Sequence, residues 1–325
     1  MQLYEQLQSS AWTSVETTTP EEQQKRKARL ISFLTEGLPT LPRYVFELNT
    51  LLSSPSVDLK RVAKVIRDNS SMSAQVIRLC NSALFSLHRR VLSIEEAAVL
   101  MGSERLRTLV LTCSVMEFTG RQLPRGEVQT FWQHGFMTGL LSECIAKWME
   151  YTEREQAYLG GLLHDIGTLP LLAIAAEEHA SKGKTSSRLW GGSLEAEKVY
   201  FGVNHCDVGR WIGQSWNFYP SFVDVFENHH SPLRSVRDPH LVGIVAAADH
   251  FCERHSMAPP LDAEAQELPE MDPALGDEFL ANCLPRLDAK DRAELTEMLE
   301  TEYLHLLPVI EFNNSAELPS DGIPD

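Results

Sequence analysis

Apolar residues recur at helical spacing along most of this 325-residue chain, and strand-like alternation is absent. Leu41, Val45, Leu48 and Leu52 fall at i, i+4, i+7 and i+11, which is one face of a helix. Comparable stripes occupy residues 59–66, 73–84, 93–102 and 105–118, and later 128–149, 153–164, 169–180, 190–201, 205–216, 220–230 and 240–254. The pattern therefore predicts an all-α protein.

Composition divides the chain into four predicted parts: a lead-in at 1–36, a five-helix unit at 37–122, a second helical unit at 123–255 and an acidic extension at 256–325. The lead-in is polar, and we expect it to be loosely ordered, ending in a short helix at Lys25–Glu36. The break LPRGE separates the two helical units.

The acidic extension contains one segment with a strong helical pattern, from Ala289 to Leu306. Leu295, Met298, Leu299 and Tyr303 form its apolar stripe. We expect this stripe to dock on the folded body, with binding to a partner protein as the alternative.

The net charge of −16 is concentrated at the C-terminal end. Residues 261–325 hold 17 acids and 3 bases, whereas the other 260 residues hold 28 acids and 26 bases. This balance disfavours binding to the phosphate backbone of nucleic acids, which needs concentrated Lys and Arg. Protein partners are the expectation.

Nothing in the sequence predicts export or a membrane span. The longest apolar runs, such as Leu169–Ala176 and Val242–Ala248, are too short to cross a bilayer. The first residues lack a basic start followed by an apolar stretch. The six cysteines form no CxxC pair, so we expect reduced core thiols in a cytoplasmic protein.

Seven polar residues interrupt the otherwise apolar helical segments of the second unit. They are His134, His164, Asp165, His205, His229, His230 and Asp249. Imidazole and carboxylate groups are the ligands that hold Zn²⁺, Mn²⁺ and Fe in proteins. Taken together, the seven residues predict a site for a divalent metal, with Fe, Mn and Zn as the candidate ions.

The two aspartates carry most weight, because an uncompensated carboxylate in an apolar helix costs several kcal/mol. Asp249 lies within LVGIVAAADHF, and Asp165 follows GGLLH. A metal or a nearby cationic side chain would remove that cost. His164 and Asp165 can face one ion if the helix ends there, as Gly167 and Pro170 indicate.

The histidines each have a simpler interpretation as well. His134 taken alone could be a hydrogen-bonded core residue. His205 follows the N-cap residue Asn204 and could bond to the backbone at a helix start. His229 and His230 could stand at a helix C-terminus because the helix dipole favours positive charge there.

The ordered set and the segments around it resemble the HD superfamily of metal-dependent phosphohydrolases, and within it the HDOD branch. The resemblance covers about residues 37–250 and includes LPTLPRYVFELNTLL, VIRDNSSMSAQVIRLCNSALFSL, SIEEAAVLMGSERLRTLVL, GGLLHDIGTLPLL and EAEKVYFGVNHCDVGRWIGQSWNFYPSFVDVFENHH. It implies a five-helix HDOD unit packed on an HD-like unit that carries the metal site.

The resemblance also implies roles for the seven residues. In the superfamily, residues like His134, His164, Asp165 and Asp249 bind one metal. In the HD-GYP relatives, residues like His205, His229 and His230 extend the site to a second ion, and the counterpart of Asp165 bridges the two.

Three departures set this chain apart from the HD-GYP phosphodiesterases. Those enzymes carry a lysine where this chain has Thr168, and a neutral hydroxyl cannot replace a cation that faces a phosphate. Their glycine-rich GYP loop is replaced here by SPLRSVRDPH, and an acid found in some relatives is Thr130.

The metal shell is thus retained while groups that would bind a substrate are missing. The resemblance implies a bacterial signal-transduction module with a metal site and without efficient hydrolase activity. The alternative is a metal-dependent phosphohydrolase or phosphodiesterase that acts on a nucleotide or cyclic dinucleotide, with Asp165 bridging the ions and orienting the attacking water. A third interpretation is a structural helical protein with hydrogen-bonded core histidines and no metal.

Overall fold

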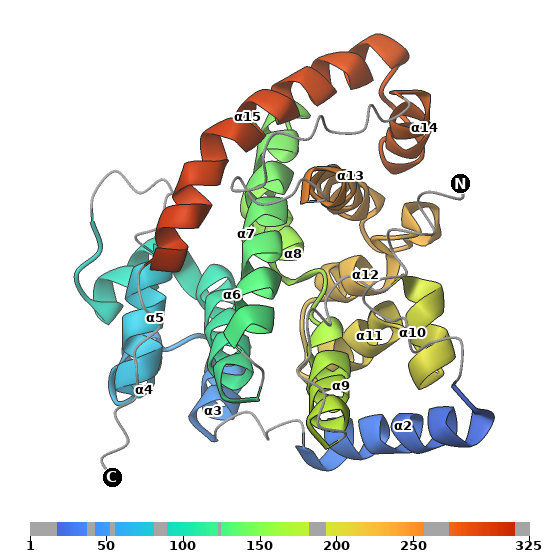
Figure 1. Cartoon of the computed structure of the whole chain (residues 1–325). Coiled ribbons are helices and arrows are strands. Elements are labelled where there is room, and N and C mark those ends of the chain that lie inside the picture. The colour runs from blue at the N-terminus through green and yellow to red at the C-terminus, as the bar shows by residue number, and fades with distance from the viewer. Residues whose placement is uncertain are drawn as a thin grey trace. The chain divides into compact units, whose positions relative to one another are not determined.

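The computed structural model describes residues 18–37, 43–52, 56–80, 90–122, 125–181, 193–256 and 273–315, and within these ranges every regular element is a helix. The prediction of an all-α fold is confirmed (Figure 1). The elements are α2 (Pro20–Ser32), η2 (Phe33–Gly37), α3 (Arg43–Leu52), α4 (Leu59–Arg67), α5 (Ser70–Cys80), α6 (Ile94–Gln122), α7 (Arg125–Trp148), α8 (Arg154–Leu163), α9 (Thr168–Ser181), α10 (Leu194–Phe201), α11 (His205–Ser215), α12 (Pro220–Asn228), η4 (Pro232–Arg234), α13 (Pro239–Ser256), α14 (Pro273–Cys283) and α15 (Ala289–Ser315).

Most predicted helices are found within a few residues of their expected bounds. The predicted pair at 93–102 and 105–118 is one element, α6, broken at Gly102, whose φ of +70° is a left-handed conformation suited to glycine. Parts of the predictions at residues 41–42, 81–84 and 190–192, residues 1–17 of the lead-in, and residues 257–272 and 316–325 of the extension lie outside the described residues.

The chain divides into two compact units, each made of two segments. Unit 1 comprises Met1–Val128 and Asp165–Tyr219, and unit 2 comprises Gln129–His164 and Pro220–Asp325. These units do not follow the predicted boundaries at 122 and 255, and the predicted division stays a prediction.

In unit 1, α3, α4 and α5 pack against α6. Their apolar stripes are buried as the spacing predicts, since Leu48, Val62, Ile66, Val76 and Leu106 have no exposed surface. The same unit contains α9, α10 and α11. Asp165 lies shortly before α9, and His205 is the first residue of α11.

The short helix predicted at the end of the lead-in is present as α2, which begins five residues earlier than predicted and packs against other helices of unit 1. Thr19 and Glu22 form a reciprocal capping box at its start. Its only buried side chains among the described residues are Leu30 and Arg26. The helix packs against α9 and α10 (Figure 1).

A buried arginine holds α2 in place. Arg26 Nε lies 2.8 Å from Glu178 Oε2, and Arg26 Nη2 lies 2.9 Å from Glu178 Oε1, so the pair is bidentate. The guanidinium also lies 3.6 Å from the ring centroid of Tyr200, whose hydroxyl donates to Glu178. Gln23 donates to the carbonyl oxygens of Lys198 and Val199, at the end of α10.

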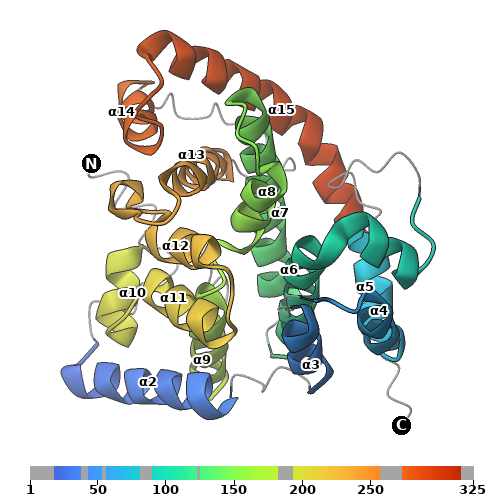
Figure 2. The same ribbon diagram turned by 180° about the vertical axis from the view of Figure 1, so that it is seen from behind.

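In unit 2, α13 packs against α8, α12, α14 and η4 (Figure 2). The helix predicted at Ala289–Leu306 is part of α15. Leu295 and Leu299 are fully buried, and the ring of Tyr303 contacts Phe251 and His255. The apolar stripe of α15 therefore docks on the body, as expected.

The stretch Arg154–Glu178 is long and apolar enough to cross a membrane by length and composition, but 89% of it is buried within the protein. The stretch comprises α8 and most of α9, and burial of that degree is typical of core helices. All six cysteines are free thiols, and five of them are buried, which agrees with the expected core thiols.

Replacing Arg26 with alanine should lower the free energy of unfolding by about 3 kcal/mol, because the Glu178 carboxylate would lose its buried cationic partner. Urea unfolding of the full chain measures this. Arg29→Ala is the matched control, since the Arg29–Glu177 ion pair on the same helix is about half exposed and should contribute less than about 1 kcal/mol. Equal losses in the two variants would contradict the assigned role of Arg26.

Candidate metal centre

The seven predicted ligands are shared between the two units. His134, His164, His229, His230 and Asp249 belong to unit 2, whereas Asp165 and His205 belong to unit 1.

Two histidines of unit 2 are brought together by the close approach of α7 and α8. A Cβ atom on Gly135 would lie 2.7 Å from Leu162 O, and one on Gly161 would lie 2.8 Å from Thr138 O. Only glycine fits at these two positions without a shift of the backbone. His134 adjoins the first glycine and His164 follows the second by three residues, so this approach places the two rings side by side.

Asp249 of α13 completes a tight cluster with these histidines. The Nε2 atoms of His134 and His164 lie 3.2 Å apart. Asp249 Oδ1 lies 3.0 Å from His134 Nε2 and 3.3 Å from His164 Nε2. The side chains of His164 and Asp249 are almost fully buried, and that of His134 is 10% exposed.

The hydrogen bonds fix which ring nitrogen of His164 faces the cluster. His164 Nδ1 lies 2.6 Å from Gly161 O, and a carbonyl oxygen can only accept, so Nδ1 carries the proton. In neutral His164 the Nε2 atom then presents a lone pair toward Asp249 Oδ1, which is itself an acceptor. The cluster therefore needs a cation, supplied either by ring protonation or by a metal.

The pKa of Asp249 reflects the same arrangement. Burial opposes ionisation of this carboxyl, but the facing imidazoles of His164 and His134 outweigh it and hold the pKa well below its usual range. The carboxylate is thus ionised and available as a ligand.

The three atoms fit the requirements of a metal tripod. Ligands bound at about 2.1 Å, at angles from roughly 90° to 110°, lie roughly 3.0–3.4 Å from one another. The three separations in the cluster, 3.0, 3.2 and 3.3 Å, fall in that range. The donor set of two imidazole nitrogens and one carboxylate suits Zn²⁺, Mn²⁺ or Fe²⁺.

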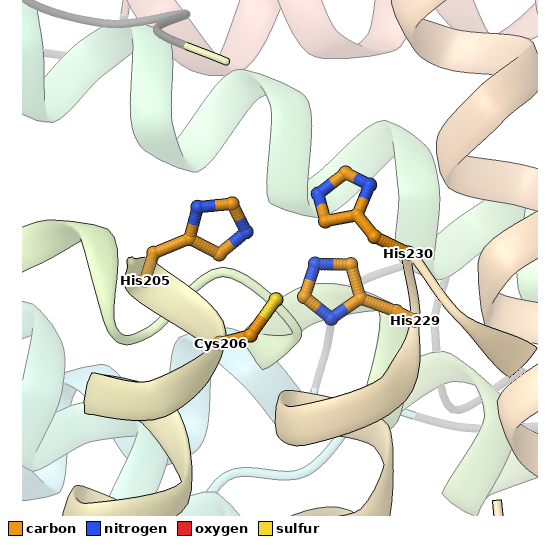
Figure 3. Close-up of side chains that lie close together, drawn as sticks. All are labelled: His205, Cys206, His229 and His230. Carbon is orange, nitrogen blue, oxygen red and sulfur yellow. The ribbon is translucent and has the colours of Figure 1, made fainter. Parts of the chain in front are cut away.

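His229 and His230 follow the C-terminal end of α12 and lie side by side (Figure 3), with ring centroids 4.3 Å apart. His229 Nδ1 donates to Val225 O, which directs Nε2 away from the helix. The ring of His229 lies edge-on to His164, and ligand atoms of His164, His229 and Asp249 lie within 4.8 Å of one another.

In unit 1, His205 opens α11 beside Cys206 (Figure 3). Glu197 of α10 accepts from the backbone N–H of His205 at 2.8 Å and lies 2.9 Å from its Nδ1. The other ring nitrogen, Nε2, lies 3.3 Å from Asp165 Oδ1. A carboxylate–imidazole pair of this kind is a common way to orient a metal-binding histidine.

The charges around His205 change its ionisation. Burial would lower the pKa of this imidazole, but Glu197, together with Cys206 and Asp165, raises it well above the usual value. A metal bound by Nε2 would therefore have to displace a proton.

Gly167 explains how Asp165 comes to lie beside His205. A Cβ atom on Gly167 would overlap the backbone of His205 and Gly209, so the turn after α8 lies directly on the first turn of α11. The sequence suggests only that a helix ends near Gly167. The structure shows that Gly167 also lies against the backbone of Gly209.

The segment after the histidine pair is held by one buried carboxylate, Asp224 of α12. Its Oδ2 accepts from the Ser235 hydroxyl at 2.8 Å and from the backbone N–H groups of Val236, Arg237 and Asp238 at 3.2, 2.7 and 3.2 Å. Burial would raise the pKa of Asp224, but these donors outweigh it and lower the pKa. Tyr151 fastens the end of the loop by donating to Asp238.

Two site residues were missed in the sequence, Glu197 and Asp224. Glu197 lies three and four residues before the buried pair Tyr200 and Phe201, which was the available sign that it faces inward. Asp224 lies between the buried residues Phe222 and Phe226, where an acid is unexpected.

Comparison with known proteins identifies the larger part of the chain. Residues 38–232 match the HDOD domain family. A Treponema pallidum (strain Nichols) protein named only as uncharacterized is 23% identical over 212 residues, which is 64% of this chain and 40% of that protein, so this chain matches less than half of the relative's length.

Three solved structures share the fold. An HDOD domain protein of unknown function from Geobacter sulfurreducens has a TM-score of 0.59 at 23% identity, covering 90% of this chain and 98% of that one. A Shewanella amazonensis SB2B protein provisionally named a metal-dependent phosphohydrolase has 0.58 at 19%, covering 87% and 99%. A Marinobacter aquaeolei VT8 protein provisionally named a signal transduction protein has 0.59 at 17%, covering 94% and 67%.

Asp224→Asn should destabilise the protein by about 1–3 kcal/mol near neutral pH, because an amide nitrogen cannot accept from the four loop donors. The pKa of Asp224 is lowered in the folded state, so its contribution is complete above the ordinary value of 3.8 and is lost as the pH falls through the lower folded-state pKa. Unfolding free energies of wild type and variant should therefore converge in acid. Glu227→Gln, a change at an exposed acid of the same helix, is the control, and a gap that persists unchanged at low pH would contradict this assignment.

Proposed function

The chain belongs to the HDOD family, and on that basis we propose that it is a signal-transduction module built around a divalent metal centre, without efficient hydrolase activity. The observation that carries the proposal is the cluster of His134, His164 and Asp249. Their three ligand atoms lie 3.0–3.3 Å apart among almost fully buried side chains, where a cation would offset the charge of Asp249.

These three residues would hold the ion, and the orientation of His164 by Gly161 O supports that role. His229 and His230 are proposed as further ligands in unit 2, and Asp165 and His205 as a ligand pair in unit 1, with Glu197 orienting His205. When bound, a divalent ion could polarise an oxygen ligand such as water or phosphate. The donor set favours Zn, Mn or Fe, and the seven ligands would suffice for one or two ions.

Two features around the ligands support a non-enzymatic role. Thr168 is buried at the start of α9 and supplies a hydroxyl where a phosphate would need a cation. The loop after His230 is tied to Asp224 by four donors, which leaves those N–H groups unavailable to a substrate. A module that binds a metal but offers few groups to a phosphate suits regulation through protein partners.

The alternative is a metal-dependent phosphohydrolase or phosphodiesterase acting on a nucleotide or cyclic dinucleotide. It is supported by the ligand set and by the fold shared with a protein provisionally named a metal-dependent phosphohydrolase. In that case Asp165 would be the catalytic residue, since its carboxylate lies beside His205 and could orient a water molecule.

Metal analysis of the tag-free full chain tests the centre itself. Wild type should contain close to one or more equivalents of a transition metal, whereas Asp249→Leu and His134→Ala should lose it, because each removes a member of the tripod. His255→Ala, at a histidine of α13 outside the cluster, should retain the metal. Less than about 0.2 equivalents in wild type after refolding with Mn²⁺, Fe²⁺ or Zn²⁺ would rule out the metal centre.

Turnover assays separate the module from the enzyme. With added metal, the protein should not efficiently hydrolyse cyclic dinucleotides, nucleoside phosphates or a generic phosphodiester, since the neutral Thr168 stands where the HD-GYP enzymes carry a lysine. Asp165→Ala is the control for any activity observed. Turnover that disappears in that variant would establish the enzyme alternative, and turnover that survives would identify a contaminant.

A further inference from the structure

One face of α13 carries a second group of ligands that includes an acid outside the seven predicted residues. Asp249 and Glu253 are one helical turn apart, so they lie on the same side of α13. His230, after the end of α12, joins them, and ligand atoms of the three side chains lie within 4.8 Å of one another. All three residues belong to unit 2.

We propose that His230, Asp249 and Glu253 form a second cation site, in which Glu253 is a metal ligand and Asp249 is shared with the first site. This inference rests on the proposed function, because both sites use Asp249. It adds a ligand beyond residues 38–232, the part of the chain that the family match covers.

The charges of the cluster favour a cation at this position. Two carboxylates four residues apart on a helix repel each other, and a cation between them removes the repulsion. Ligand atoms of Asp249 and Glu253 lie within 4.8 Å of each other, so one cation could bind both carboxylates. The recorded contacts of Asp249 with His134 and His164 are both made by Oδ1, so the same carboxylate has a second oxygen to offer.

The donor types also suit a divalent transition metal. One imidazole and two carboxylates are ligands for Zn²⁺, Mn²⁺ and Fe²⁺. Three protein ligands leave coordination positions for water or for a small oxygen donor such as inorganic phosphate. A small molecule that binds to this ion would therefore be an oxyanion.

The two sites differ in exposure, which predicts different affinities. The tripod of His134, His164 and Asp249 is nearly buried. In the second group Glu253 is exposed and His230 is half-buried. An ion at Glu253 would meet water and exchange readily, so it should bind more weakly than the ion of the tripod.

Calorimetric titration of the chelator-stripped full chain with Zn²⁺ or Mn²⁺, together with metal counts after dialysis, tests the proposal. Wild type should bind a tight equivalent and a weaker one. Glu253→Gln should weaken the second by roughly tenfold to a hundredfold and leave the first unchanged, since losing even an indirect partner of a metal commonly costs this much. The side chain at 253 is exposed, so the variant should unfold at the same urea concentration as wild type.

Glu227→Gln provides the matched control, because it removes one exposed negative charge beside the histidine pair without touching the proposed ligands. Equal weakening in the two variants would mean a general charge effect and would overturn the proposal. One tight equivalent in wild type that Glu253→Gln does not alter would overturn the second site alone. No metal bound to wild type would instead overturn the proposed function, so the two failures are distinguishable.

Discussion

The arrangement of unit 2 depends on one buried charge, the carboxylate of Asp249. An ionised acid inside the apolar helix α13 is tolerated only with cationic compensation. That compensation comes from His134 on α7 and His164 after α8, which can meet only because glycines allow these helices to approach closely. The packing of these helices and the candidate metal cluster therefore follow from the same requirement.

Four acids that are buried or half-buried show how the type of partner separates structural pairs from candidate ligands. Glu178 is paired with Arg26, which keeps its proton, and Asp224 is paired with backbone and hydroxyl donors. These pairs are fixed and stabilise α2 and the loop after the histidines. Asp249 and Glu197 instead face imidazoles, whose protons a metal ion can replace. The candidate site thus lies where the groups that compensate the buried carboxylates are imidazoles, which can gain or lose a proton.

Helices and their buried faces could be predicted because local spacing determines them. The predicted ligands were recognisable for a related reason, since Asp249 interrupts an apolar run. The docking of α2 could not be read in the same way, because it depends on Arg26 meeting Glu178 across 152 residues of sequence. Glu197 and Asp224 were missed as well, because the buried residues around them indicate that they face inward but not which groups they meet.

The choice between a regulatory module and an enzyme depends on the surroundings of the ligands more than on the ligands. Hydrolysis of a phosphate ester needs donors aimed at charge that develops in the transition state. Here the backbone donors of residues 236–238, a few residues after the histidine pair, already bind Asp224, and Thr168 contributes no charge. Releasing those donors for a substrate would break hydrogen bonds of a buried carboxylate. The free-energy cost would be higher than for a loop that has no such hydrogen bonds. A loop held in this way beside the candidate metal site therefore favours the proposed module, whose metal would stabilise a surface for partners, over an enzyme that closes on a substrate.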